Sequence, residues 1–348
     1  MRREAARDAH APPAPARPLR AEPAVAGILH AHGADGIGAL GVTPIGGPPR
    51  FVTRVHTEDA DYAGLATGQS ALILGDAQAV LHAMPAGSVQ TVVTSPPYWS
   101  LRDYGIDGQL GLEESVYDYI ETLATLFDDV FRVLVDDGTV WLNIGDSYTS
   151  GGRATRASDK KNVARAMSIR PPTPEGLKPK DLIGVPWRLA FALQDRGWYL
   201  RSEVIWHKPN AQPESVRDRP TRAHEHLFLL SKSERYQYDP MAVRGPNGRR
   251  LRTVWDLTTK AYREARGHFA TFPPGLVDPC IRLTTHPGDL VLDPFVGSGT
   301  TSLRAGLLGR RFAGIELNPA YVEMARKRLV RNGFVESLDE LVGKAGHG

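Results

Sequence analysis

The chain has 348 residues, of which 41% are hydrophobic and 23% charged, and its formal net charge is +3. This length can bury the core of one large domain or two small ones, and an aromatic content of 8% excludes disorder throughout. No apolar run approaches the ~18 residues of a membrane helix, and the chain starts without the apolar core of a secretory signal. Cys280 is the only cysteine, which excludes a disulfide framework and a cysteine zinc cluster. The cytoplasm is therefore the expected compartment.

The first 50 residues contain 12 Ala, 8 Pro and 7 Gly. Such a segment buries too little apolar area to offset the entropy of ordering it, so we expect a disordered tail over residues 1–65. We expect a folded domain at 66–335 and a short C-terminal tail at 336–348.

From about residue 70 onward, short apolar runs alternate with helical patterns. The clearest helix spans 115–134, where Ser115 suits the N-cap and Gly138 follows the end. Strands are predicted at 71–74, 91–94, 139–142, 202–206, 227–230, 290–292 and 311–315. Further helices are predicted at 77–84, 185–194 and 275–284, after a glycine turn at 293–301, and from Pro319 onward. This alternation predicts an α/β fold with a mostly parallel sheet and helices on both faces.

The glycine turn Asp293-Pro-Phe-Val-Gly-Ser-Gly-Thr-Thr301 follows a predicted strand and opens a predicted helix. Its glycines let the backbone approach a ligand, and the helix N-terminus offers N–H donors. Glu316 ends the next strand, where a carboxylate can accept hydrogen bonds from ribose hydroxyls. No Gly-Lys-Ser/Thr follows, which disfavours an ATP-binding P-loop. The turn therefore indicates an adenosine-bearing cofactor, either a dinucleotide or S-adenosyl-L-methionine.

A second motif, Ser95-Pro96-Pro97-Tyr98, comes directly after the strand predicted at 91–94. Two consecutive prolines make a stiff turn without N–H donors, which leaves its carbonyls as acceptors. The Ser95 side chain and the Pro96 carbonyl could hold an exocyclic amino group, with Tyr98 stacked on the ring that bears it. A rigid connecting loop is the plain structural alternative, and the glycine turn together with Glu316 disfavours it.

These motifs resemble those of the amino-group DNA methyltransferases, which modify cytosine N4 or adenine N6. The catalytic motif precedes the cofactor turn by about 200 residues, which is similar to the circularly permuted β class. The resemblance runs from Leu72 to Arg331 and includes His268-Phe-Ala-Thr-Phe272-Pro and Gly314-Ile-Glu316. It implies a Rossmann-like methyltransferase fold and the cofactor S-adenosyl-L-methionine.

The resemblance also implies roles for individual residues. The catalytic set is Ser95, Pro96, Pro97 and Tyr98, acting on a base flipped out of the duplex. Glu316 would hold the ribose of the cofactor and Asp76 its adenine amino group, while Phe269 and Phe272 would surround its methionine part. The cofactor-binding turn comprises Asp293, Pro294, Phe295, Gly297, Ser298, Gly299, Thr300 and Thr301.

The first position of the catalytic motif favours one target base. Adenine-modifying members of the resembled family usually carry Asp there, and cytosine-N4 members usually carry Ser, as Ser95 is here. We therefore favour cytosine N4, and adenine N6 stays open. Competing interpretations are an RNA or protein methyltransferase, which the motif order disfavours, and a DNA-binding protein without catalysis, which the intact motifs disfavour.

Basic residues gather in two segments between the core motifs: residues 151–180 carry a net charge of +6, and residues 241–266 carry +5. Such stretches indicate contact with a polyanion. We expect target recognition by 150–182 and 239–266. Phosphate contacts are expected from Lys208, Arg217, Arg219, Arg249, Arg250 and Arg252, with an internal salt bridge through Asp218 as the alternative for the first three.

The expected partner is double-stranded DNA, and the enzyme is expected at the nucleoid. No association with a membrane is expected. A cognate restriction endonuclease on the same site could accompany the enzyme, and homodimers occur in this class. No metal is expected: His224 and His226 share a strand face without a third ligand at a suitable spacing. Pro279-Cys280 is similar to the nucleophile of cytosine-C5 methyltransferases, but we expect Cys280 to be a packing residue.

Overall fold

The structure is a computed structural model that describes residues 53–57, 60–150, 171–245, 248–259 and 273–335. Within these ranges the strands are β1 (Thr53–Thr57), β2 (Ser70–Leu74), β3 (Val89–Thr94), β4 (Leu134–Ile144), β5 (Tyr199–His207), β6 (His224–Ser231), β7 (Val254–Asp256), β8 (Leu290–Asp293) and β9 (Arg311–Glu316). The helices are α1 (Ala63–Ala66), α2 (Ala77–Ala83), α3 (Val116–Val133), α4 (Val185–Asp195), α5 (Pro274–Thr284), α6 (Thr300–Leu307) and α7 (Pro319–Arg331).

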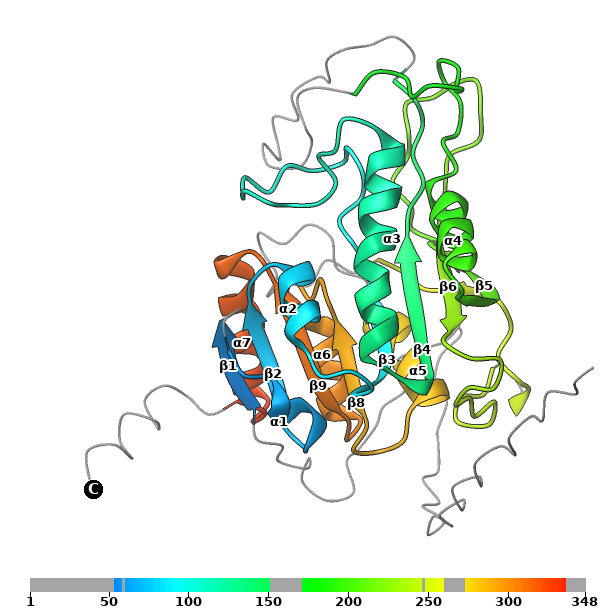
Figure 1. Cartoon of the computed structure of the whole chain (residues 1–348). Coiled ribbons are helices and arrows are strands. Elements are labelled where there is room, and N and C mark those ends of the chain that lie inside the picture. Colours follow the sequence, from blue (N-terminus) through cyan, green and yellow to red (C-terminus); the bar gives the residue numbers. More distant parts are fainter. Residues whose placement is uncertain (1–52, 58–59, 151–170, 246–247, 260–272, 336–348) are drawn as a thin grey trace, which may run out of the picture.

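All described strands form one nine-stranded sheet in the order β1-β2-β9-β8-β3-β4-β6-β5-β7 (Figure 1). Every neighbouring pair is parallel except β4 with β6 and β5 with β6. The predicted α/β fold with a mostly parallel sheet is therefore confirmed, and β6 is the strand that runs against the others.

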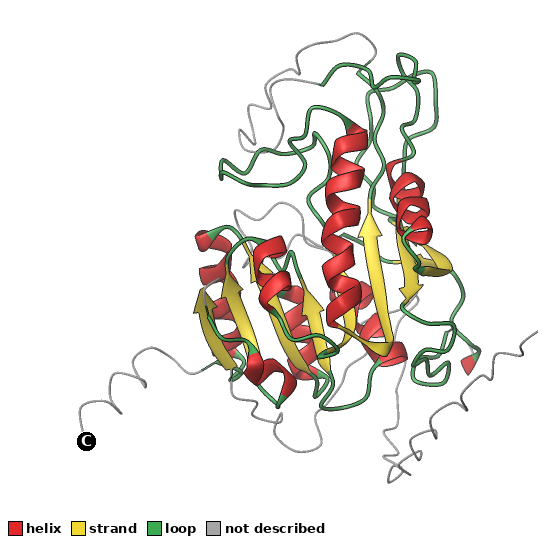
Figure 2. Cartoon of the chain, viewed as in Figure 1, coloured by secondary structure: helices red, strands yellow, loops and turns green. Residues whose placement is uncertain are grey.

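Helices cover both faces of the sheet (Figure 2). Side chains alternate between the two faces, so neighbouring residues of one strand enter different cores. In β2, Ile73 belongs to the core that includes residues of α2, α3 and α4, whereas Leu72 belongs to the core that includes residues of α5, α6 and α7. Burial on both faces requires nearly continuous apolar strands, and this is why apolar runs predicted the central strands well.

The long helix α3 follows its sequence pattern at the N-terminus. Ser115 Oγ accepts a hydrogen bond from the Asp118 N–H at 3.1 Å, as an N-cap residue should. Its end agrees with the prediction to one residue, but the following strand was predicted too short, because β4 begins directly at Leu134 and includes Gly138. Leu134 pairs with Val89 of β3, so tertiary pairing and not a glycine ends the helix.

Two elements lie inside the segment expected to be a tail, so the predicted boundary at residue 65 was wrong. β1 pairs in parallel with β2 along its whole length, and Leu65 of α1 is buried in the core. The β1 sequence has no apolar alternation, and its order comes from backbone hydrogen bonds to β2. Residues 1–52 and 336–348 lie outside the described residues.

β7 lies inside the expected recognition segment 239–266 and adds a strand beside β5. Its Trp255 is buried, with its ring centroid 6.2 Å from that of Trp141. β7 has only three residues, which are too few for an apolar run or an alternating pattern. The strand could therefore not be predicted from the sequence. Part of the segment therefore belongs to the sheet, whereas residues 246–247 and 260–272, like 151–170 of the other segment, lie outside the described residues.

The carboxyl ends of the parallel strands β2, β3, β4, β8 and β9 lie along the same side of the sheet, which is where open α/β sheets bind ligands. The antiparallel strand β6 starts on this side, and β5 ends there. No helix in the described part of the chain is long and apolar enough to span a membrane.

Candidate active site

The motif Ser95–Tyr98 leaves the end of β3 as irregular backbone, and a turn closed by the Leu101 N–H on the Tyr98 carbonyl follows it. Its conformation is held from α3, where the Tyr119 hydroxyl donates to the Pro97 carbonyl at 2.7 Å. The Tyr98 ring lies against Gly145, the residue after β4, and a Cβ added there would lie 2.7 Å from Tyr98 Cε2. Gly145 is therefore needed for the close approach of the ring to the backbone.

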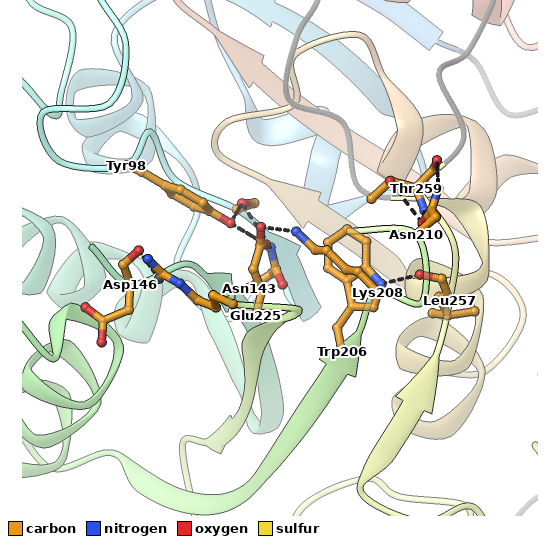
Figure 3. A network of polar contacts seen from close by, with 11 residues as sticks. Tyr98, Asn143, Asp146, Trp206, Lys208, Asn210, Glu225, Leu257 and Thr259 are labelled. Carbon is orange, nitrogen blue, oxygen red and sulfur yellow. Dashed lines mark hydrogen bonds and ion pairs between the residues drawn. The ribbon is translucent and has the colours of Figure 1, made fainter. Parts of the chain in front are cut away.

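The Tyr98 hydroxyl belongs to a polar network at the end of the sheet (Figure 3). It donates to Glu225 Oε2 at 2.7 Å and accepts from Asn143 Nδ2 at 3.0 Å. Asn143 Nδ2 also donates to Glu225 Oε2 at 2.9 Å, and Lys208 forms an ion pair with Glu225 Oε1. These four side chains come from four places in the sheet. Asn143 lies on β4 and Glu225 on β6, while Tyr98 follows β3 and Lys208 follows β5.

Electrostatics keep this network in a defined protonation state. Burial next to the Glu225 carboxylate raises the pKa of Tyr98 well above its usual value, so the phenol keeps its proton. Burial alone would raise the pKa of Glu225, but the Lys208 ammonium and the hydrogen bonds from Asn143 and Tyr98 hold it below its usual value. The network therefore contains a neutral phenol and an ionised carboxylate.

Sequence reasoning missed Glu225 and Asn143. Asn143 interrupts the apolar run of β4 and is 2% exposed, so a buried polar residue beside the strand end was the available signal. Glu225 stands between His224 and His226, where charge alone gives no hint of burial. Sequence proximity could not reveal it, because Glu225 and Tyr98 are 127 residues apart.

Basic residues expected to contact phosphates divide into two groups. Lys208 is engaged with Glu225 inside the site, and Arg219 pairs with Glu214 at 2.5 Å while its guanidinium lies 3.7 Å from the Tyr148 ring centroid. The salt bridge of Asp218 is formed with Lys180, at 2.8 Å, and not with a neighbouring arginine. Four of the expected arginines are exposed: Arg217, Arg249, Arg250 and Arg252.

The glycine turn lies between the end of β8 and the start of α6, as predicted. Its first residue, Asp293, is 1% exposed and joins the two motifs, since Thr94 Oγ1 donates to Asp293 Oδ1 at 2.6 Å. Asp293 also accepts from the Thr301 hydroxyl at 2.7 Å and the Phe295 N–H at 3.1 Å. Burial raises the pKa of Asp293 to about 6 against these hydrogen bonds.

Glu316 at the end of β9 faces the turn. Its carboxylate accepts from the Gly297 N–H at 2.9 Å and the Asn318 N–H at 2.8 Å. Burial is the main reason that the pKa of Glu316 rises to about 7. A largely buried carboxylate at the carboxyl end of a strand, beside a glycine turn, fits the ribose of an adenosine-bearing cofactor.

Arg328 of α7 holds the turn from behind and was also missed. It is 5% exposed, and its Nη1 donates to the Ser298 carbonyl at 2.6 Å, to Ser298 Oγ at 3.0 Å and to Thr300 Oγ1 at 3.3 Å. Ser298 and Thr300 therefore face α7 with their side chains. The buried arginine gave no signal, because its helix also carries three other basic residues, Arg326, Lys327 and Arg331, which are partly or fully exposed.

The remaining predicted cofactor residues have mixed outcomes. Asp76 is the N-cap of α2 and accepts from the Ala79 N–H at 2.9 Å, so its carboxylate has a structural contact besides any ligand. Pro294 and Phe295 lie within the turn as expected. Phe269 and Phe272 lie outside the described residues.

The structural interpretations of the histidines and the cysteine fit their surroundings. His226 Nδ1 lies 2.6 Å from Glu203 Oε1, and Cys280 is buried with its thiol donating to the Leu276 carbonyl at 3.0 Å. Burial raises the pKa of the Cys280 thiol well above its usual value, the opposite of an activated nucleophile. Among the described residues, no group of three or more His, Cys, Asp or Glu side chains could hold a metal ion.

Comparisons with known sequences agree with this geometry. A family model described as DNA methylase, of the N6/N4 methyltransferase type, matches residues 89–327. The Type II methyltransferase M.XycI of Xanthomonas campestris is 60% identical over 286 residues, which cover 81% of this chain and 93% of that protein. M.Cfr9I of Citrobacter freundii is 57% identical over 285 residues, with the same coverage of 81% and 93%.

Solved structures share the fold. A DNA modification methylase of Thermus thermophilus, complexed with S-adenosyl-L-methionine, is 26% identical with a TM-score of 0.55 and covers 81% of this chain and 94% of its own. The PvuII cytosine-N4-specific DNA methyltransferase is 20% identical with a TM-score of 0.59 and covers 86% and 94%. The chain therefore belongs to the N6/N4 family of DNA methyltransferases, whose methyl donor is S-adenosyl-L-methionine.

Proposed function

We propose that this protein is a site-specific methyltransferase that methylates N4 of cytosine in duplex DNA. The observation that carries the choice of base is Ser95 at the first position of the catalytic motif. Ser95 and Pro96 directly follow the end of β3, and the two prolines of the motif offer no N–H donors. Two acceptors, the Ser95 hydroxyl and the Pro96 carbonyl, suit an amino group, whose two hydrogens are both donors.

The chemistry needs orientation more than an activated nucleophile. The cofactor supplies a methyl group already activated by its positive sulfur. The amino nitrogen of a base is weakly nucleophilic, because its lone pair is delocalised into the ring. Hydrogen bonds from its N–H groups to Ser95 and Pro96 would free that lone pair and aim it at the methyl group, while Tyr98 stacks on the flipped ring.

We infer the cofactor contacts from the geometry of the turn. Glu316 would accept from the ribose hydroxyls, and the backbone between Asp293 and Thr301 would face the remainder of the ligand. The contact of Asp76 with the adenine remains a proposal from the resemblance. The same holds for the placement of Phe269 and Phe272 around the methionine part of the cofactor.

For DNA, a pocket beside the motif gives support to the first recognition segment. It is lined by Trp99–Leu101, by Ser147–Ser150 after β4, and by Pro171, Pro172 and Pro174. These prolines belong to the described end of segment 150–182, so that segment adjoins the catalytic turn. We propose that it reads the target sequence together with the basic segment 239–266.

The Type II relatives support a restriction–modification setting, in which a cognate endonuclease cuts the same DNA site when it is unmethylated. We accordingly propose action on cellular DNA in the cytoplasm, at the nucleoid. A homodimer remains a prediction from the resemblance.

Mass spectrometry of nucleosides tests the proposal. Unmethylated duplex DNA, RNA and protein are incubated separately with the enzyme and S-adenosyl-L-methionine. We expect 4-methyldeoxycytidine from the DNA alone. Detection of 6-methyldeoxyadenosine without 4-methyldeoxycytidine would show that the Ser95 argument is wrong, although the family would stand.

Tyr98→Ala provides the matched variant for this assay. Loss of stacking should raise the activation free energy of turnover by about 1–3 kcal/mol, by analogy with the stacking energy in single-stranded DNA binders. The affinity for the cofactor should stay unchanged. An equal loss of cofactor affinity would place Tyr98 in the cofactor site instead.

A further inference from the structure

The ion pair between Lys208 and Glu225 has no role in the chemistry described so far. It lies at the end of the catalytic network, and the two side chains are only 18% and 17% exposed. A largely buried ion pair is weak evidence for stability, because desolvation of both charges offsets their attraction. Its position next to Tyr98 therefore points to a role in the site.

The charge of Glu225 fixes the direction of the hydrogen bond from Tyr98. An ionised carboxylate can only accept, so the Tyr98 hydroxyl hydrogen must point to Glu225 Oε2, 2.7 Å away. The groups that face Glu225 are Lys208 after β5, Tyr98 after β3 and Asn143 on β4, and all three donate to it. Lys208 is the cation that maintains this charge.

Tyr98 in turn fixes the direction of the Ser95 hydroxyl. With its own hydrogen committed to Glu225, the Tyr98 oxygen accepts from Asn143 at 3.0 Å and from Ser95 Oγ at 3.4 Å. The Ser95 bond is long, as catalytic hydrogen bonds often are before substrate binds. Ser95 thus points its hydrogen at Tyr98. Its oxygen accepts from Asn143 Nδ2 at 3.4 Å and keeps a second lone pair for an incoming donor.

We propose that Glu225, charged by Lys208, is a positioning residue that sets the polarity of the Tyr98 and Ser95 hydroxyls, so that Ser95 accepts a hydrogen bond from the target amino group. This inference rests on the proposed transfer to a base amino group. Without the charge, Tyr98 could donate to Ser95, and Ser95 would then turn its own hydrogen toward the amino group. Two donors would face each other, which costs a buried polar group its partner.

A double-mutant cycle tests whether Glu225 acts through Tyr98. Glu225→Gln should lower kcat by about tenfold or more, with less than a threefold change in cofactor Kd. Tyr98→Phe keeps the ring and removes the hydroxyl, so in that background Glu225→Gln should change kcat by less than about twofold. Equal losses in both backgrounds would overturn the proposal.

The pH profile supplies a readout that a purely structural role would not move. Lys208→Met leaves the Glu225 carboxylate buried without its cation, which raises its pKa. The acidic limb of kcat should therefore shift to higher pH, and turnover should recover as the pH rises. A loss that is the same at every pH would contradict the inference.

One control variant and the identity of the product keep the outcomes distinct. Glu323→Gln removes an exposed ion-pair carboxylate on α7 and should change neither kcat nor its pH profile. If Glu225→Gln fails to fold, judged by its thermal transition, the Lys208→Met profile decides alone. If the parent enzyme yields no amino-methylated base, the proposed function fails first, whereas a normal product with an unshifted Lys208→Met profile refutes only the role of Glu225.

Discussion

Two buried carboxylates, Asp293 and Glu316, lie at the glycine turn and differ in the donors that surround them. Burial raises the pKa of Asp293 to about 6 and that of Glu316 to about 7, and the charge of Asp293 adds to the shift at Glu316. Asp293 is enclosed by hydroxyl donors that join β3 to α6, so its role is to connect the two motifs. Glu316 keeps only backbone donors, and its oxygens also face the turn.

The raised pKa predicts that cofactor affinity depends on pH. A ribose hydroxyl needs an acceptor, so binding should favour the ionised form of Glu316. As the pH falls through about 7, protonation should weaken binding of S-adenosyl-L-methionine, by about fourfold at pH 6.5 relative to pH 8.5. Calorimetric titration between about pH 6.5 and 8.5, which lies above the pKa of Asp293, checks this.

Variants at Glu316 separate this effect from general acid sensitivity. Glu316→Gln cannot titrate, so its affinity should be flat over the same range, at whatever level it binds. Glu316→Ala should weaken binding by about 1–3 kcal/mol at high pH. A flat profile for the parent protein would show that the carboxylate is not part of the cofactor site.

Gly299 is the second residue-scale case, because its backbone and its surroundings both exclude a side chain. Its φ of +80° lies in the left-handed region, and an added Cβ would lie 2.8 Å from the Ala325 Cβ on α7. Gly299→Ala should destabilise the protein by about 1–3 kcal/mol more than Gly288→Ala, whose φ is +88° in open space. Thermal or denaturant unfolding measures the difference.

Ala325→Gly tests the contact through a double-mutant cycle. It removes the 2.8 Å contact with the Cβ but leaves Ala325 Cα at 3.1 Å, and it costs about 1 kcal/mol by itself as a glycine inside a helix. Gly299→Ala should therefore destabilise the Ala325→Gly background less than it destabilises the parent protein, and equal losses in both backgrounds would show that contact with the Ala325 side chain is not what excludes a side chain at this position.

At the scale of elements, α7 acts as a support for the glycine turn, through Arg328. Arg328→Met should lower affinity for S-adenosyl-L-methionine by about 1.5–3 kcal/mol, since the turn loses charged donors at Ser298 and Thr300. Lys327→Met, one residue earlier and exposed, should leave affinity unchanged. Affinity is measured well below the unfolding temperature of each variant, and an unchanged Arg328→Met value would make the contact purely structural.

Elements with a strong local pattern could be predicted, and those ordered by their neighbours could not. The central strands and α3 carry apolar runs or stripes of their own, which is why their positions followed from the sequence. β1 and β7 are short edge strands whose order comes from pairing with β2 and β5. The same division holds in the site: Ser95–Tyr98 and the glycine turn are contiguous motifs, whereas Glu225, Asn143 and Arg328 act from other elements.

For the whole molecule, the sheet brings together segments far apart in the chain. Thr94 and Asp293 are 199 residues apart in sequence, and their side chains are 2.6 Å apart. The order of the motifs along the chain is therefore of no consequence for the site, provided that their strands are neighbours. β3 lies directly beside β8, which places the Ser95–Tyr98 motif next to the glycine turn.

Exposed charge should decide which face of the molecule binds DNA. Arg249, Arg250 and Arg252 are exposed and precede β7 at one edge of the sheet, whereas Lys208 and Arg219 are engaged with carboxylates. If the three arginines contact phosphates, replacing all three with Gln should weaken DNA binding. The slope of log affinity against log salt should then flatten by about 0.9 per lost contact.

A control of equal charge makes this last measurement specific. Arg54, Lys327 and Arg331 are exposed on β1 and α7, and β1 is the opposite edge of the sheet from β7. Replacing these three with Gln changes the net charge by the same amount, so a uniform field effect would alter both triple variants alike. Only contact at the β7 edge flattens the slope in the first variant and not in the second. Identical slopes for the two variants and the parent protein would make Arg249, Arg250 and Arg252 ordinary surface charges and move the DNA-binding face elsewhere.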